Sequence, residues 1–330
     1  MPTSIGRLVG LMSLLDRYPT RPYAGRSDLG AMVVLLNARQ DREGGEEHTT
    51  VESMAQQYEH LQRCNPLTDI LLIEADDEVV GYGRTTWNDV AEGYRAYWMV
   101  AEASPQHPGL EEAIFDWAEQ RAIAIAATHP QGDKRLAAWT DESSPRRSFL
   151  RTRGYEVDSY GEVLVRLSLE NVPERSLPEG VEVRPVEERH LRAIWEADVE
   201  AFRDHRGYTE QTEEDWAAWL EDPHADPLLW QVAWADDEVV GQVRSFIDHE
   251  QNRRFGRLRG WTENISTHRS WRKRGVASSL ICSSLVLLRE RGMSEAGLGV
   301  DTENLSGAFD LYRSLGFVED RIEAEYHRQI

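Results

Sequence analysis

The segment 266–281, STHRSWRKRGVASSLI, holds the residues whose types and spacing are best suited to chemistry. Its basic residues Arg272, Lys273 and Arg274 stand directly before Gly275-Val276-Ala277, where residues 275 and 277 are small and apolar periodicity predicts that a helix begins. The first N–H groups of a helix carry partial positive charge, and small residues let a phosphate approach them closely. The segment therefore predicts a phosphate-binding turn, with a solvated basic turn before an ordinary helix as the alternative.

The charge of the whole chain makes this basic segment unusual. The sequence has 58 Asp and Glu residues against 37 Lys and Arg, a formal net charge of -21. Such a surface repels nucleic acid and anionic lipid headgroups, so we expect neither as a partner, whereas cations and amines are attracted. A local reversal of charge favours an anionic ligand there, and further arginines add to it: Arg253, Arg254, Arg257, Arg259 and Arg269.

Metal, disulfide and membrane chemistry are disfavoured by the remaining composition. The two cysteines, Cys64 and Cys282, lie in separate halves and are too few for a disulfide framework or a soft metal site. The acidic run beginning at Asp301 does not make a calcium loop, because Leu305 stands where an oxygen ligand is needed. The N-terminal apolar stretch lacks a cleavage site, and no stretch approaches a membrane span, so we expect a cytoplasmic protein without a metal.

The heptapeptide ADDEVVG occurs twice, at residues 75–81 and 235–241. Each copy lies between two apolar runs, which predicts a β-hairpin with acidic residues in its turn. Upstream, Arg21-Pro22 parallels Arg184-Pro185, and downstream Gly154 parallels Gly316, all at nearly the same offset. Matches in one order at one offset indicate a duplicated domain.

The order of predicted elements in the second copy is β-α-α-β-β-β-α-β-α-β, a mixed α/β arrangement. We expect Thr212 to begin the second helix as its N-cap and Gly292 to end the long helix that starts near residue 276. The polar segment 169–180, with two prolines, has the composition of a linker. The expected domains are therefore residues 1–168 and 181–330.

The segment LGVDTENLSGAFDLYRSLGF resembles the closing motif of the GNAT superfamily of acyl-CoA-dependent N-acetyltransferases. The residues that carry the resemblance are Asn304, Ala308, Leu311, Tyr312, Gly316 and Phe317, with Arg272, Gly275 and Ala277 matching the family's upstream motif. It spans residues 181–330 directly and 20–168 by repetition. It implies two tandem GNAT folds, each with a central, mostly antiparallel twisted sheet flanked by helices.

The resemblance also implies acetyl-CoA as co-substrate and a small-molecule amine as acceptor. The pyrophosphate would lie on the N–H groups around residues 272–277, and the pantetheine arm would follow the strand that ends at Ile265 and Thr267. Asn304 would hold the cofactor amide or the loop beside it. Tyr312 occupies the family's general-acid position, with packing on the core as the alternative.

The general base is less clearly specified by the sequence. Glu263 stands on the same strand, and regular alternation would put it on one face with Ile265 and Thr267. Some family members carry the glutamate two residues earlier, where this chain has Trp261, so an exposed strand carboxylate is an equal alternative. His205 is a weaker candidate for the acceptor pocket, because a lone loop histidine is more often a surface residue.

The first copy does not repeat the chemistry. At the place of the phosphate-binding turn, Gly109 is followed by Glu111 and Glu112, whose carboxylates repel a phosphate. Leu150 stands where the second copy has Tyr312. We therefore expect one active site, in the C-terminal half of a monomer or homodimer. The tandem arrangement also resembles that of mycothiol synthases, which would imply a cysteinyl pseudodisaccharide as acceptor, and a non-catalytic acyl-CoA-binding regulator is the alternative of another class.

Overall fold

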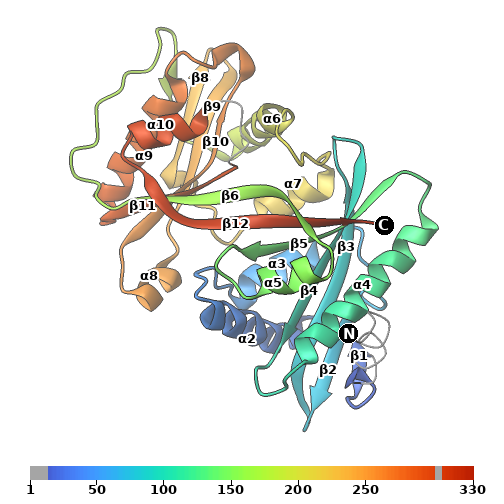
Figure 1. The fold of residues 1–330 in the computed structure, drawn as a ribbon. Helices are drawn as coiled ribbons and strands as arrows, with labels where there is room; N and C mark the ends of the chain where they lie inside the picture. Colours follow the sequence, from blue (N-terminus) through green and yellow to red (C-terminus); the bar gives the residue numbers. More distant parts are fainter. Residues whose placement is uncertain (1–13, 302–306) are drawn as a thin grey trace. The chain divides into compact units, whose positions relative to one another are not determined.

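The computed structural model describes residues 14–301 and 307–330 of the chain. The chain forms two compact units, one of residues 1–158 with 324–330 and the other of residues 159–323. The chain passes from the first unit to the second within strand β6 (Glu156–Arg166) and returns within strand β12 (Val318–Gln329) (Figure 1).

The first unit follows the order expected from the repeat. Its elements are β1 (Thr20–Pro22), α2 (Arg26–Glu43), α3 (Val51–Glu59), β2 (Ile70–Ala75), β3 (Glu78–Asp89), β4 (Tyr94–Ala103), α4 (Leu110–Thr128), β5 (Asp133–Asp141) and α5 (Arg146–Thr152). The strands lie in the order β1-β2-β3-β4-β5-β12. Only β4 and β5 are parallel among the pairs β1–β2, β2–β3, β3–β4 and β4–β5.

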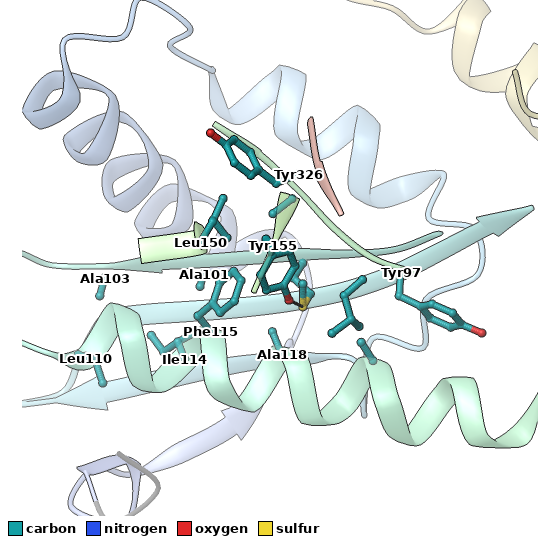
Figure 2. Packing of buried hydrophobic residues seen from close by; sticks show 14 of the residues in the cluster. Tyr97, Ala101, Ala103, Leu110, Ile114, Phe115, Ala118, Leu150, Tyr155 and Tyr326 are labelled. Atoms are coloured by element: carbon teal, nitrogen blue, oxygen red, sulfur yellow. Dashed lines mark hydrogen bonds between the residues drawn. The ribbon is translucent and has the colours of Figure 1, made fainter. Parts of the chain in front are cut away.

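The sheet of the first unit is covered on both faces. Leu72 and Ile73 are adjacent on β2 and both fully buried, so their side chains point to opposite faces. Leu72 packs with α2 and α3, and Ile73 packs with α4 and α5. Figure 2 shows the second of these clusters, where Ile114 and Phe115 of α4 face the sheet.

The second unit repeats the arrangement. Its elements are β7 (Glu182–Val183), α6 (Leu191–Phe202), α7 (Glu213–Leu220), β8 (Trp230–Ala235), β9 (Glu238–Phe246), α8 (His249–Phe255), β10 (Arg259–Thr267), α9 (Val276–Glu290), β11 (Glu295–Asp301) and α10 (Ala308–Ser314), with one-turn 3₁₀ helices at 188–190, 227–229 and 269–271. The strand order is β6-β11-β10-β9-β8-β7. Apart from the short helix α8, this is the order that the sequence predicts.

The expected signals at the element ends are confirmed. Thr212 caps α7 in a reciprocal capping box with Asp215, and Gly292 follows α9 in the left-handed conformation, with φ of 86°. Both copies of ADDEVVG form two-residue hairpin turns, at Asp76-Asp77 and Asp236-Asp237. The last residue of each copy has a packing reason to be glycine. A Cβ on Gly81 would lie 2.6 Å from Ile114 of α4, and one on Gly241 would lie 2.7 Å from Val276 of α9.

The division between the units differs from the expected boundaries of 168 and 181. The segment 169–180, expected as a linker, lies inside the second unit. The physical reason is an exchange of terminal strands. Residues 161–166 of β6 pair with β11 of the second unit, and Ile330 at the end of the chain donates its N–H to Lys134 of the first unit at 3.0 Å. Tyr326 of β12 is fully buried in the first unit's core.

Two further expectations concern burial and membranes. Both cysteines are free, and Cys282 is buried within α9. Among the described residues, no helix combines the length and the apolar character needed to cross a bilayer.

Candidate active site

The second unit contains a split between its two parallel strands. Arg259–Trp261 of β10 pair with Glu295–Gly297 of β11. The pairing stops there, although β10 continues to Thr267 and β11 to Asp301. Beyond the paired residues, the carboxylate of Glu263 accepts a hydrogen bond from the backbone N–H of Gly299 at 2.9 Å. A side chain thus takes a backbone donor of β11 at the point where the two strands stop pairing.

A β-bulge lies at the same place. Asn264 has a left-handed φ of 49°, and the register between β10 and β9 shifts between Glu263 and Ser266. β10 therefore has one residue more than regular alternation allows, so Glu263 and Thr267 do not share a face. The expected common face of Glu263, Ile265 and Thr267 is wrong for this reason.

Tyr312 and Glu263 are electrostatic neighbours in the fold. Tyr312 lies on α10, is 6% exposed, and packs edge-on against Phe317. Burial, and after it the charge of Glu263, raises the pKa of Tyr312 far above its usual value near 10. The phenol is therefore held in its protonated form, which is the form that a proton donor requires. Both of the roles considered from the sequence, packing and proton donation, are compatible with this position.

The predicted phosphate-binding turn ends in an open helix terminus. Gly275 is the N-cap of the 15-residue helix α9, has φ of 88°, and makes no side-chain cap. The nearest atom to a Cβ built on it is Ser278 Oγ at 3.8 Å, so the space in front of the first turn is open. Val276 is buried against Gly241, and Ala277 is the next residue of that turn. This small-residue cradle with an uncapped helix start suits a phosphate.

The basic residues of the turn have different roles in the structure. Arg272 reaches back to the end of α6, where it donates to the Ala201 carbonyl at 3.1 Å and pairs with Asp204 at 3.4 Å. Lys273 and Arg274 are exposed, and the guanidinium of Arg274 lies over the ring of Trp271. Arg272 is thus positioned to hold the turn on α6, while the other two present charge to solvent.

Of the arginines expected to extend the basic cluster, Arg269 lies at the turn, where it pairs with Glu200 at 2.9 Å and shares Asp204 with Arg272, and the others lie elsewhere. Arg253 and Arg254 end helix α8, and Arg259 begins β10, where it pairs with Glu295 at 2.8 Å. The nine-residue strand β10 separates Arg259 from the turn after Thr267 by about 26 Å, at roughly 3.3 Å per residue. The wider cluster is therefore wrong for the arginines at the far end of β10, and Arg269 alone of the five extends the basic turn: the four at the far end are Arg253, Arg254, Arg257 and Arg259.

The remaining predicted site residues fall into three groups. Ile265 is partly buried against the core that holds α9, and the Thr267 carbonyl accepts from Arg272 at 3.4 Å. His205 follows α6, and its pKa is lowered by burial first and then by the charge of Arg272, which places it beside the turn. Asn304 lies outside the described residues.

Sequence reasoning missed a buried ion pair across the strand from Glu263. Arg244 of β9 is in register with Glu263, and its guanidinium binds Asp198 of α6 at 2.7 Å. Burial raises the pKa of Asp198, an effect that the charge of Arg244 opposes. A signal was present, since arginine stands three residues after ADDEVVG in both copies, and Arg84 is stacked on Tyr58 as Arg244 is on Trp219.

The sequence of the second unit matches a known protein family. Residues 191–317 match the Acetyltransferase (GNAT) family. The matched residues run from helix α6 to the residue before β12 and include the split, the turn and α10. No curated protein sequence matches the chain.

Solved structures share the tandem GNAT fold along nearly the whole chain. A GCN5-related N-acetyltransferase from Sphaerobacter thermophilus is 24% identical, with a TM-score of 0.68 over 95% of this chain and 96% of that one. A tandem GNAT protein from the clavulanic acid biosynthesis pathway is 15% identical, with a TM-score of 0.63 over 94% of this chain and 98% of that one. The resemblance to tandem GNAT proteins is thereby confirmed at the level of the fold, and the family supports an N-acyltransferase activity.

The first GNAT-like unit keeps the frame of the site with other residues. Its parallel strands β4 and β5 are in register only to Trp98 and Ala137, although β4 continues to Ala103. Gly109 caps α4 with φ of 81°, and its first turn carries Glu111 and Glu112. Leu150 stands on α5 where α10 has Tyr312: Tyr155 donates its N–H to Leu150 O at 3.2 Å, as Phe317 does to Tyr312 O at 3.1 Å.

Proposed function

We propose that the second unit transfers an acetyl group from acetyl-CoA to a primary amine of a small molecule, by direct attack of the amine on the thioester. The observation that carries the proposal is the split between β10 and β11, in which the Glu263 carboxylate replaces strand pairing at Gly299. The GNAT match over the same residues supports the reaction class.

The donor fits the elements around the split. Acetyl-CoA would place its pyrophosphate on the open first turn of α9, where Gly275 and Ala277 leave room and Lys273 and Arg274 supply exposed positive charge. The pantetheine arm would lie along β10 past Trp261, where the strand is no longer in register with β11. Ile265 and Thr267 belong to that stretch.

The reaction needs a base that takes a proton from the attacking amine and an acid that gives a proton to the departing thiolate. An ammonium with a pKa of roughly 10 must lose a proton before it attacks, and in this proposal the Glu263 carboxylate accepts it, directly or through water. A backbone N–H of β10 in the split stabilises the negative charge that develops on the thioester oxygen. The departing thiolate, which resembles a free thiol of pKa roughly 8.5, takes its proton from Tyr312.

The two groups are coupled through their charges. The raised pKa of Tyr312 makes it a poor proton donor while Glu263 is ionised, because that carboxylate contributes to the rise. Once Glu263 has taken the proton of the amine, its contribution to the raised pKa of Tyr312 is gone, although burial still raises that pKa. The proposal therefore puts amine deprotonation first and thiol protonation second.

The acceptor is recognised as a cation by a strongly acidic chain. With a net charge of -21, the protein attracts amines over long distances and disfavours polyanions. A cysteinyl pseudodisaccharide amine, as for mycothiol synthases, is one acceptor of this class.

The test is a panel of primary amines with acetyl-CoA, read as release of free thiol. Glu263→Gln should lower kcat by about 10²–10⁴-fold, the worth of acid–base catalysis, and most severely at low pH where free amine is scarce. High pH should restore part of the rate. The control is Glu250→Gln, an exposed glutamate of α8, which should act as the unmodified protein does. Binding of acetyl-CoA without turnover of any amine would favour the acyl-CoA-binding regulator.

A further inference from the structure

The first unit contains a cavity of about 440 Å³ at the place that corresponds to the phosphate-binding turn of the second unit. The end of β4, the turn 104–109, the start of α4, the end of α2 and the start of α5 line it, so every lining residue belongs to the first unit. Its size is that of a small-molecule site. The proposed acetyl transfer makes no use of this cavity.

The lining contains a buried arginine whose charge is incompletely satisfied. The Arg146 side chain is 7% exposed, and its Nε has no hydrogen-bond partner among the described residues. One Nη donates a long bond of 3.4 Å to the Ala101 carbonyl and lies 3.7 Å from a carboxylate oxygen of Glu111. Burying a charge without a close partner costs free energy, which a bound anion would recover.

The neighbouring arginines differ, because each has its own carboxylate. Arg39 donates to Glu102 at 2.7 Å and Arg42 donates to Glu111 at 2.8 Å. The charge of Arg146 also acts on Glu102, but Arg39 has the greater influence on that carboxyl group. Arg146 is therefore the lining arginine with room for a further partner.

The corresponding residue of the second unit shows that this charge is particular to the first. Arg146 begins α5 four residues before Leu150, and Ala308 begins α10 four residues before Tyr312. Where the second unit has the small residue Ala308, the first unit therefore has the buried guanidinium of Arg146. The uncapped N-terminus of the 19-residue helix α4 faces the same cavity through Gly109 and adds partial positive charge.

The remaining lining selects for one negative charge and an apolar body. Glu43, Glu111 and Glu112 repel a diphosphate, whereas Phe115, Phe149 and three prolines offer apolar surface. The guanidinium fork of arginine suits a carboxylate. We propose that this cavity binds a small monocarboxylate with an aromatic or aliphatic body, its carboxylate on Arg146 and its body against Phe115 and Phe149.

The test uses the full chain and benzoate, with benzamide as the neutral isostere and pyrophosphate as the polyanion. Benzoate should bind once per chain in titration calorimetry and raise the melting temperature, and benzamide and pyrophosphate should not compete for the site. Arg146→Met should weaken benzoate binding by roughly 10- to 100-fold, the value of a hydrogen bond to a charged group. Arg26→Met, at an exposed arginine of α2 that is not among the lining residues, is the matched control and should leave the benzoate affinity unchanged.

A second variant keeps the test decisive if Arg146→Met fails to fold. Ala103 lines the cavity at the end of β4, so Ala103→Leu should fill space there and abolish benzoate binding while Arg146 stays in place. Equal affinity for benzamide, undiminished binding in both variants, displacement by pyrophosphate, or no effect of benzoate on melting would each overturn the proposal.

Discussion

The turns before α4 and α9 are two versions of one structure, and their difference separates what the fold needs from what the chemistry needs. Gly109 and Gly275 both cap a long helix in the left-handed conformation. Gly81 and Gly241 both lie under the first turns of that helix, where a Cβ would come within 2.7 Å of a side chain. The fold thus fixes these four glycines in both units.

The residues that face the helix terminus are not fixed by the fold. The second unit has Ala277 in the first turn of α9, and the first has Glu111 in that of α4, where Arg42 holds it at 2.8 Å. A carboxylate of the chain thus occupies the first turn, where the second unit leaves space for a phosphate. The same fold therefore supports one helix terminus that is open to a phosphate and one whose first turn carries a carboxylate of the chain.

The strands show the same contrast. Both parallel pairs separate part-way along, but only β10 has a bulge at that point: Val100 of β4 pairs with Arg84, and Glu102 with Tyr82, without a shift. Arg84 of β3 corresponds to Arg244 of β9. Arg84 is in register with Val100, and Arg244 is in register with Glu263, so Val100 occupies the position in the first unit that Glu263 occupies in the second. A split is therefore part of the fold, whereas the bulge and the carboxylate beside it belong to the second unit alone.

The largest expected effect tests whether only one terminus accepts a phosphate. Titration calorimetry of the unmodified chain should give one equivalent of acetyl-CoA. Gly275→Glu should remove measurable binding, because it places a carboxylate against the pyrophosphate. Gly109→Glu should leave that equivalent intact.

Backbone strain is separated from charge by Gly275→Ala. Both substitutions carry the strain of a left-handed φ, roughly 1–2 kcal/mol, but only glutamate adds charge. Gly275→Ala should therefore retain weakened binding. Two equal sites in the unmodified chain would contradict the loss of the first site.

The next effect concerns Tyr312, whose counterpart is Leu150. Tyr312→Phe should lower kcat by about 10²–10⁴-fold and leave acetyl-CoA affinity nearly unchanged, because the ring packing is kept and only the proton donor is lost. Since the pKa of Tyr312 is raised, kcat should show no alkaline fall near pH 10 from its ionisation. Loss of acetyl-CoA binding in this variant would instead support a packing role.

The fold could be predicted from the sequence where a local pattern carries it. The repeated hairpin, the Thr212 cap and the Gly292 stop each depend on residues close in sequence, and all are confirmed. The start of α9 was predictable for the same reason.

Features set by long-range pairing could not be predicted. Nothing near residue 160 shows that β6 pairs with β11 more than 130 residues later, or that β12 returns to the first unit. The bulge at Asn264 depends on register with β9, so alternation along β10 alone gave the wrong face for Glu263. Arg146 was missed because its burial depends on elements far apart in the sequence.

A smaller effect compares the packing of the two glycines under the helices. Gly81→Ala and Gly241→Ala should each destabilise the chain by about 1–3 kcal/mol, as overpacking does, because each new Cβ also lies 3.2 Å from a backbone oxygen. Denaturant unfolding measures this loss. Only Gly241→Ala should also weaken acetyl-CoA binding, since Val276 begins the helix that holds the site. Gly132→Ala, with open space around it and, like Gly81 and Gly241, no left-handed φ, is the control for introducing a methyl group.

The smallest effect uses the two thiols, one in each unit. Burial raises the pKa of Cys64 to about 11 and also raises that of Cys282. At pH 8 only about one Cys64 in 10³ is thiolate, so neither should react quickly with a thiol reagent in the native chain. In denaturant both should become reactive over the same concentration range, because each unit takes a strand from the other half of the chain and cannot keep its sheet when the other unfolds. Cys64→Ser and Cys282→Ser assign the two signals. Early exposure of one thiol while the other stays protected would show that the units unfold separately despite the exchanged strands.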